Sequence, residues 1–558
     1  MRLKICSPSP ATAIGLRLRR WKGQGLEIRV GKQYLGQGNG SLASEEYFFG
    51  EGIGFAMVGS TFSARAHRFR SFFADKGNSL FPNDVRHLVC LLNSRRVRSI
   101  LESLNPSISF QAGDVNRVPL FPMDESARLF SLIEQAFAEA ESRRETSVEF
   151  QRPGPTSWRH VQAWSQLAVD RPDGAPLPTY EPEYDPESPA DHLSFAVGIA
   201  LGRLGADGQG IQAEAPPRAL PHGILFLEDG SDDDNLTHLA AAPILAAWAE
   251  HGVAIDDKRT LKNYLRDRFF PDVHRKMYEN RPIYFPLSSG KKSFVAYVSI
   301  HRWTASTLND LLAEHLYPAK KRLEGEQADL RRVRDSVDKM SAKAAEKRFG
   351  EVGKWVEELN DFIANVEQCA QKGPPPPDGK TKPREVDARY EPDLDDGVMI
   401  NAAALWPLLE PQWKDPKKWW RELANAEGKK DYDWAHLAKR YFPDRVDAKC
   451  KLDPSLAVAH GCFWKYHPAK AYQWELRLQD EIRPDFTLAE VGSDAARAAF
   501  EADHADEVEA LVAKEHQRRQ RKQAKAGQAE GGGDEPQREL DLADANAGDN
   551  DADEELSA

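Results

Sequence analysis

Basic and aromatic side chains interleave in the stretch STFSARAHRFRSFFADKGNSLFP, where Arg65, Arg68 and Arg70 lie within six residues. Lys76 and Asn78 follow in a predicted turn. Arginine forks suit phosphate oxygens and guanine edges, and asparagine can read adenine through two hydrogen bonds. On a β-strand, alternation would turn Arg68 and Arg70 to one face. These five residues are therefore candidate DNA contacts, and a solvated basic face is the alternative.

A second basic group opens a predicted helix with one apolar face, formed by Val97, Ile100, Leu101 and Leu104. Asn93 and Ser94 precede this helix and can supply its N-cap. Three arginines crowd the first turns, where the helix dipole does not favour a cation. An outside anion would explain their placement, although a solvated face would also allow it. We therefore expect further phosphate contacts at Lys32, Arg95, Arg96 and Arg98.

The pair Asn105-Pro106 is the only Asn-Pro sequence in the chain. Methyltransferases that act on amino groups of DNA hold the target nitrogen with an Asn-Pro-Pro-aromatic loop, whose ring stacks on the flipped base. Ser107 and Ile108 stand where the second proline and the ring belong. We therefore expect a turn at Asn105 and no catalytic residue in this chain.

Motifs for cofactors and metals are incomplete. Gly50-x-Gly52-x-Gly54 follows an apolar run, but the residues after it predict a strand and a turn, whereas a dinucleotide loop must lead into a helix. No common zinc spacing connects His436, Cys450, His460 and Cys462. We therefore expect no cofactor-binding and no metal-binding residue in this chain.

The totals describe a multidomain protein of 558 residues with 41% hydrophobic and 29% charged residues. The five cysteines are odd in number and scattered, which fits reduced thiols better than a disulfide framework. No uncharged apolar run reaches the length of a membrane helix. We expect a cytoplasmic protein without membrane contact.

Charge is distributed unevenly along the chain, whose net charge is −12. Residues 1–120 hold 17 lysines and arginines against 8 aspartates and glutamates, whereas residues 527–558 hold eleven acidic residues and one arginine. A basic front and an acidic tail on one chain favour a polyanionic partner at the front.

The distribution of residue types predicts an α+β multidomain architecture. We expect six segments: short strands and a helix at 1–123, a helix and a mixed α/β accessory region at 124–320, an antiparallel helical pair at 321–371, a Pro-rich linker at 372–390, a helical Trp-rich unit at 391–504, and a helix end with a disordered acidic tail at 505–558.

Three of these segments carry more specific expectations. The stretch RPIYFPLSSGKKSFVAYVSIHRW predicts a β-hairpin that turns at residues 288–292. The two helices of the pair are expected to be separated by a break around Gly350 and Gly353. A partner-binding coiled coil is the alternative to a packed antiparallel pair. We expect order to end beyond Gln517, where charged residues, glycine and alanine dominate.

Several segments in the same order resemble PglX-like adenine-specific DNA methyltransferases of BREX phage-defence systems and the related DISARM methyltransferases. The front segments are YFFGEGIGFAMVGSTFSARAHRFRSFFADKGNSLFP and LVCLLNSRRVRSILESLNPSISFQAGDVNRVPLF. The hairpin stretch follows, and then DLDDGVMINAAALWPLLEPQWKDPKKWWREL and YDWAHLAKRYFPDRVDAKCKLDPSLAVAHG. Together these segments cover most of residues 22–470.

The resemblance implies that residues 1–123 form a DNA target-recognition-like domain, which SISFQAGDVNRVPLF closes. In that family a catalytic domain precedes this region, binds S-adenosylmethionine and carries the Asn-Pro-Pro-aromatic motif. The chain thus resembles the C-terminal half of such an enzyme, without the catalytic domain. S-adenosylmethionine is expected on that missing domain, no catalytic or cofactor-binding position can be carried over, and the chain is expected to be inactive alone.

Three functions remain open at this point. The first is a DNA-binding target-recognition and accessory portion of a PglX-like methyltransferase in anti-phage defence or restriction-modification, with double-stranded DNA as its partner. The second is one subunit of a split enzyme, completed by a separate N-terminal methyltransferase polypeptide. The third is a protein-interaction scaffold, in which residues 321–368 and the Trp-rich unit dock other phage-defence proteins.

Overall fold

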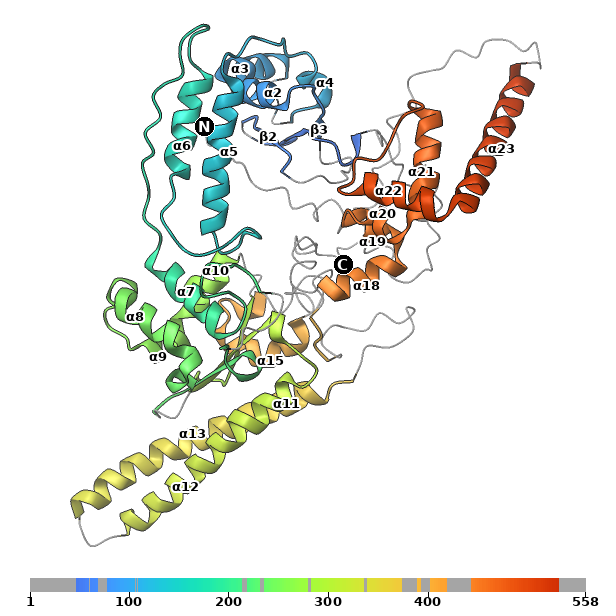
Figure 1. Cartoon of the computed structure of the whole chain (residues 1–558). Helices are drawn as coiled ribbons and strands as arrows, with labels where there is room; N and C mark the ends of the chain where they lie inside the picture. Colours follow the sequence, from blue (N-terminus) through green and yellow to red (C-terminus); the bar gives the residue numbers. More distant parts are fainter. Residues whose placement is uncertain are drawn as a thin grey trace, which may run out of the picture.

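The computed structural model describes residues 47–530, apart from gaps at 60, 69–77, 106, 108, 213–217, 231–234, 279–282, 336–338, 374–388, 393–401 and 419–442. Helices dominate, and two small antiparallel sheets accompany them, so the predicted α+β class is confirmed. One long helical pair projects from the body (Figure 1). None of the helices in the described residues combines the length and the apolarity needed to cross a membrane.

The first sheet is antiparallel, in the order β2-β1-β3, with strands β1 (Ile53–Phe55), β2 (Ala64–Ala66) and β3 (Ser79–Leu80). It is followed by helices α2 (Val85–Leu92), α3 (Arg95–Leu104) and α4 (Ala112–Val115), which lie next to the sheet in Figure 1. Ile53 and Phe55 are buried together with Leu91 of α2 and Val97 of α3. Burial of this apolar set holds the helices on one face of the sheet.

Two polar residues between α2 and α3 fix their junction. Ser94 Oγ accepts a hydrogen bond from the backbone N–H of Val97 at 3.3 Å, so the predicted cap of α3 is confirmed for Ser94. Asn93 ends α2 and has a different role. Its side-chain amide accepts from the N–H of Ala64 and donates to the carbonyl of the same residue, at 3.2 and 2.9 Å. Asn93 thereby attaches the end of α2 to β2.

Helices α5 (Ser126–Arg143) and α6 (Trp158–Val169) pack side by side and share the core of this first unit (Figure 1). Leu129, Ile133 and Phe137 are buried on α5, at intervals of four residues that place them on one face. Val161 and Val169 of α6 enter the same core. The boundary predicted at residue 123 therefore falls inside a continuous apolar core.

The second sheet has the order β4-β6-β5, with strands β4 (Ile224–Glu228), β5 (Tyr284–Ser288) and β6 (Phe294–Ser299). The predicted hairpin is confirmed, since β5 pairs antiparallel with β6. Every residue of the three strands is buried. Both faces are therefore covered, by parts of a surrounding shell that includes α7 (Pro189–Ala200), α8 (Ala242–Ile255), α9 (Leu261–Tyr264), α10 (Arg275–Met277) and α15 (Trp406–Leu409).

The projecting pair consists of α12 (Tyr317–Arg334) and α13 (Lys339–Gln371), which follow α11 (Thr307–Leu311) and run antiparallel (Figure 1). The predicted break around Gly350 and Gly353 is wrong, because α13 continues through both glycines. Glycine costs an α-helix about 1 kcal/mol. Burial of Val352 and Leu359 against α12 and its neighbours offsets this cost.

The C-terminal part is a group of helices: α18 (Pro443–Leu452), α19 (Pro454–Ala459), α20 (Phe463–Tyr466), α21 (Pro468–Glu481), α22 (Ser493–Asp503) and α23 (Ala505–Glu530). Trp464 and Trp474 are buried here. Trp413 instead contacts Phe270 near the second sheet, with ring centroids 5.4 Å apart. The predicted Trp-rich unit is thus divided between two places, and Trp419, Trp420 and Trp434 lie outside the described residues.

Helix α23 extends beyond the point where order was predicted to end. It runs to Glu530, past Gln517. Arg518 and Arg519 pair with Asp480 of α21 at 3.1 and 3.3 Å. These ion pairs add to the packing of Val508 and Leu511, which lie against the core at the N-terminal part of the same helix. Residues 531–558, with the predicted disordered tail, lie outside the described residues.

Candidate nucleic-acid interface

The first sheet presents a polar face opposite its core. Residues paired across strands share a face, and Gly54 of β1 is opposite both Arg65 of β2 and Ser79 of β3. Ile53, in the neighbouring row, points into the core and is fully buried. Arg65 therefore lies on the outer face, where its neighbour across the sheet is a glycine. A Cβ at Gly54 would lie 3.4 Å from His67 Nε2 and 3.9 Å from Arg65 Nε, so both of these side chains lie over the glycine.

His67 extends this polar face beyond the end of β2, although the sequence analysis did not single it out. Its Nε2 lies 3.2 Å from Ser79 Oγ, and its ring meets Phe81 edge-on at 5.9 Å. Burial, and then the charge of Arg65, lower the pKa of His67. At neutral pH the ring is thus a neutral hydrogen-bonding group. Its position two residues after Arg65 is the strand alternation that could have identified it.

Aromatic rings lie at one edge of this face. Tyr47 stacks on Phe81 with centroids 4.8 Å apart, and Tyr47 is 42% exposed. Phe62, which interleaves with the arginines in sequence, is instead fully buried and packs against Phe110. Proximity in sequence therefore does not identify the rings that reach solvent.

Arg68 does not lie on the strand, so the predicted alternation with Arg70 is wrong for this residue. Strand β2 ends at Ala66, and Arg68 turns back toward α5. Its Nη2 lies 2.7 Å from Glu149 Oε2, and its guanidinium carbon lies 4.7 Å from the ring centroid of Phe137. The side chain is only 15% exposed. The structure gives Arg68 internal partners that hold the sheet against α5.

The remaining candidate DNA contacts outside α3 are only partly described by the structure. Asn78 directly precedes β3, its backbone carbonyl accepts from the N–H of Phe55 at 3.1 Å, and the residue is half-buried. Lys32, Arg70 and Lys76 lie outside the described residues. DNA contact at these four positions stays a prediction.

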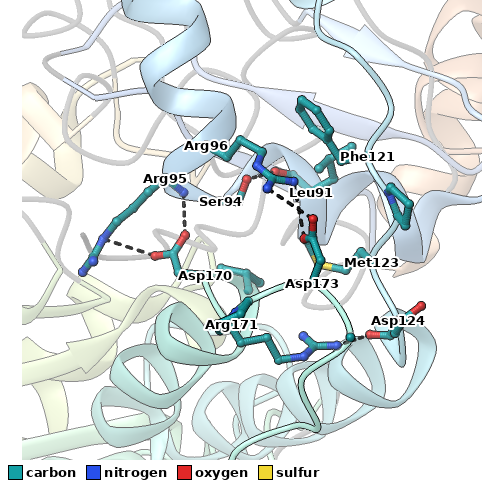
Figure 2. A pocket seen from close by; sticks show the side chains of 14 residues that line it. Leu91, Ser94, Arg95, Arg96, Phe121, Met123, Asp124, Asp170, Arg171 and Asp173 are labelled. Atoms are coloured by element: carbon teal, nitrogen blue, oxygen red, sulfur yellow. Dashed lines mark hydrogen bonds and ion pairs between the residues drawn. The ribbon is translucent and has the colours of Figure 1, made fainter.

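The start of α3 brings basic and acidic groups together, as Figure 2 shows. The backbone N–H of Arg95 donates to Asp170 Oδ1 at 2.6 Å, and Arg95 Nε lies 3.2 Å from Asp170 Oδ2. Arg96 pairs with Asp173 at 3.3 Å. An outside anion was expected for these arginines, but in the structure they meet aspartates of the protein itself, on the segment that follows α6. Their contact with an outside phosphate stays a prediction. No local sequence signal could have identified these aspartates, because they lie more than 70 residues away.

A pocket of about 300 Å³ opens beside these pairs (Figure 2). Phe121 and Met123 supply an apolar wall, and the guanidinium carbon of Arg96 lies 4.6 Å from the Phe121 ring centroid. Arg171 reaches across to the backbone carbonyl of Asp124 and fixes the acidic segment. Arg95 and Arg96 are 72% and 49% exposed, so both can exchange an aspartate for an external anion. The pocket can therefore accept a phosphate beside a flat apolar group.

Arg98 differs from its neighbours on α3. It is half-buried, and its Nε and Nη2 have no hydrogen-bond partner among the residues that the structure describes. Since no described carboxylate pairs with Arg98, its charge is not compensated locally and adds to the positive field of this helix.

Asn105 forms a turn, and its amide group is fully engaged. Its Oδ1 accepts from the N–H of Ser107 at 3.1 Å, while Nδ2 donates to the carbonyl of Ser109 and to Asp114 Oδ2, both at 3.0 Å. This side chain holds the backbone together after α3. It offers no free amide to a base.

Gly52 of the glycine motif and the buried thiol of Cys90 both have structural explanations. A Cβ at Gly52 would lie 2.8 Å from the carbonyl of Leu80, so this glycine allows β3 to approach β1. Burial raises the pKa of the Cys90 thiol to about 12, which keeps it protonated. No group of three or more metal-ligating side chains occurs among the described residues.

Comparison with known proteins gives two relatives. The adenine-specific methyltransferase BrxX of Escherichia coli O9:H4 (strain HS) is 23% identical over 501 aligned residues, covering 71% of this chain and 39% of BrxX. The adenine-specific methyltransferase PglX of Lacticaseibacillus casei (strain Zhang) is 24% identical over 469 aligned residues, covering 69% of this chain and 37% of PglX. No protein-family model matches the chain.

These matches confirm the resemblance to PglX-like adenine-specific methyltransferases. The chain spans about two fifths of the length of the curated relatives it matches.

Proposed function

We propose that this chain is a DNA target-recognition and accessory portion of a PglX-like adenine-specific methyltransferase that acts in anti-phage defence. The two relatives support the enzyme family. We infer DNA contact from the exposed start of α3, where Arg95 and Arg96 form ion pairs with two carboxylates. A DNA phosphate can form the same kind of ion pair with these arginines. The polar outer face of the first sheet supplies a second surface.

In this proposal the two surfaces have different tasks. Arg95, Arg96 and Arg98 contact the phosphate backbone and set the register of the duplex. Arg65 and His67 lie on a sheet face whose side chains can reach base edges. Arg68 serves as a positioning residue, because its carboxylate partners hold it inside the protein.

Methyl transfer belongs, in this proposal, to a catalytic domain of the kind expected in the longer relatives, with S-adenosylmethionine bound there. That domain can also be a separate polypeptide, which is the split-enzyme alternative. We expect the purified chain to bind duplex DNA and to incorporate no label from tritiated S-adenosylmethionine. Strong labelling by the chain alone would contradict the division of roles. Labelling that appears only after mixing with a second polypeptide would favour the split enzyme.

One observation favours the scaffold as a second candidate. Met340 is 84% exposed and Val333 is 43% exposed near the end of the projecting α12–α13 pair. Exposed apolar side chains at the end of an extended hairpin can dock another defence protein. Partners recovered with the full chain should then be lost in a Val333→Ser, Met340→Ser variant that still binds DNA. Retention of every partner would count against this candidate.

A further inference from the structure

A second pocket, of about 340 Å³, lies at the opposite end of α5 from the candidate interface. Arg143 of the last helical turn and Arg152 of the following segment line it. Glu187, His192 and Phe195, from the start of α7 and the residues before it, complete the lining. An 18-residue helix is about 27 Å long, so this site is separate from the start of α3.

Arg143 retains an unused charge in this pocket. Its Nε is buried and has no hydrogen-bond partner within the described part of the chain. The adjacent Arg144, by contrast, pairs with Glu141 at 2.7 Å. Gly154 packs directly on the guanidinium of Arg143, because a Cβ there would lie 3.0 Å from Nε. The pocket is thus built around a positioned arginine that has no acidic partner among the described residues.

Arg152, on the segment that follows α5, also packs against a glycine. Its aliphatic stem lies over Gly208, whose φ of +74° favours glycine. A Cβ at Gly208 would lie 3.5 Å from Arg152 Cδ. Within the described ranges Arg152 forms no ion pair and no hydrogen bond. Two arginines therefore bring uncompensated charge to the same pocket.

The acidic group of the pocket, Glu187, is engaged by a neighbouring histidine and not by either arginine. Glu187 Oε1 lies 3.0 Å from His192 Nε2, and the His192 ring stacks on His251 with centroids 4.2 Å apart. The lining therefore stays net positive, with two arginines against one carboxylate. Phe195 is half-buried and contacts Phe150 edge-on at 5.8 Å, which leaves an apolar wall beside the charges.

We propose that this pocket binds the phosphate of a nucleotide, with the sugar or the base against Phe195. Arginine forks match phosphate oxygens through paired charge-assisted hydrogen bonds. Either a free nucleotide or one nucleotide of a DNA strand can supply this group. The site does not depend on DNA contact at α3.

Calorimetric titration of the full chain with adenosine monophosphate, inorganic phosphate and duplex DNA tests the proposal. The variant Arg143→Gln, Arg152→Gln removes the two charges, and Arg128→Gln on the exposed start of α5 is the matched control. Gly154→Ala keeps both charges but displaces Arg143, and circular dichroism establishes that each variant is folded. Loss of one charge-assisted contact should weaken binding about tenfold.

The results distinguish the two sources of phosphate. If the source is a free nucleotide, the wild type and Arg128→Gln bind adenosine monophosphate, and the double variant and Gly154→Ala lose at least tenfold in affinity. If the source is DNA, only duplex affinity falls in these variants. Unchanged affinity for all three probes in the double variant would overturn the proposal. Variants of Arg95 and Arg96 should leave nucleotide binding intact, so failure of the α3 interface is recognised separately.

Discussion

Asp170 Oδ1 accepts a hydrogen bond from the backbone N–H of Arg95 at 2.6 Å, so a carboxylate from the end of α6 lies on the N-terminus of α3. The other oxygen, Oδ2, accepts from Gln166 Nε2 at 2.6 Å and lies 3.2 Å from Arg95 Nε. A negative charge at this place compensates for arginines that the helix dipole does not favour. A DNA phosphate that approaches α3 must therefore compete with Asp170.

Asp170→Asn should strengthen DNA binding while it weakens the fold. Removing a carboxylate beside Arg95 removes a repulsion of about 1 kcal/mol toward a phosphate, or about fivefold in affinity. Loss of the charge at the helix N-terminus should lower the free energy of unfolding by about 1 kcal/mol. Fluorescence anisotropy and thermal denaturation measure the two effects. The exposed Asp494→Asn is the control, and equal or weaker DNA binding by Asp170→Asn would contradict the competition.

The buried pair Glu145–Arg203 should be critical for stability. Arg203 Nη1 lies 2.8 Å from Glu145 Oε1, and Tyr278 and Tyr284 bond to the pair. Glu145→Ala leaves a buried guanidinium without its carboxylate, which costs about 3–5 kcal/mol. Asp329→Ala in an exposed pair with Arg332 should cost less than about 1 kcal/mol. Denaturant titration compares the two, and similar losses would show that Glu145 is not essential.

Glycine substitutions should have opposite effects at two positions. Gly350 lies inside α13 with open space around its Cβ position, so Gly350→Ala should stabilise the chain by about 1 kcal/mol. Gly52→Ala should destabilise it, because the new Cβ would lie 2.7 Å from Phe81 Cε1. Melting temperatures measure both changes. A lower melting temperature for Gly350→Ala would show that the helix needs flexibility there.

Local sequence patterns predicted the elements that local interactions determine. The serine before α3 caps it, and the alternating residues around Gly290 form a hairpin. Each of these features depends on residues close together in the chain. The same reasoning identified Asn105 as a turn, and its amide bonds only to residues within nine positions.

Long-range contacts account for what the sequence did not reveal. Arg68 was placed on a strand, but a carboxylate 81 residues away draws its side chain inward. The partners of Arg95 and Arg96 are equally distant in sequence. Strand β4 has four apolar residues followed by Glu228, and periodicity cannot distinguish so short an apolar run from a buried helix segment. Tertiary packing, which no local pattern encodes, decided these cases.

The stability of the second sheet unit should fall as pH decreases from about 6.5, the ordinary pKa of histidine. His274 is fully buried, and its Nε2 accepts from the N–H groups of Ile283 and Tyr284 at 3.1 Å. Burial, and then the charge of Arg203, lower the pKa of His274 well below its usual value. The unfolded chain therefore binds a proton that the folded chain does not, and stability present above pH 6.5 is lost below it.

The expected slope for this one histidine is about 1.4 kcal/mol per pH unit. Thermal denaturation between pH 7.5 and 5.5 measures it. His274→Gln keeps an acceptor for the two N–H groups and should flatten the dependence, although it should also lower stability at pH 7.5. An identical pH dependence in the variant would assign the effect to other groups.

Replacing Arg65, Arg95 and Arg96 by alanine should weaken duplex binding and also reduce its dependence on salt. Each phosphate that a cation neutralises contributes about −0.9 to the slope of log affinity against log salt. If all three arginines contact phosphates, the magnitude of the slope should fall by about 2.7. Anisotropy titrations at several salt concentrations measure it, and Arg332→Ala, which removes one exposed arginine far along the chain on α12, is the control for charge loss away from this surface. If Arg65 contacts a base edge instead, the slope should fall by only about 1.8, and Arg65→Ala should weaken discrimination between duplex sequences. An unchanged slope in the triple variant would show that DNA does not bind at this surface.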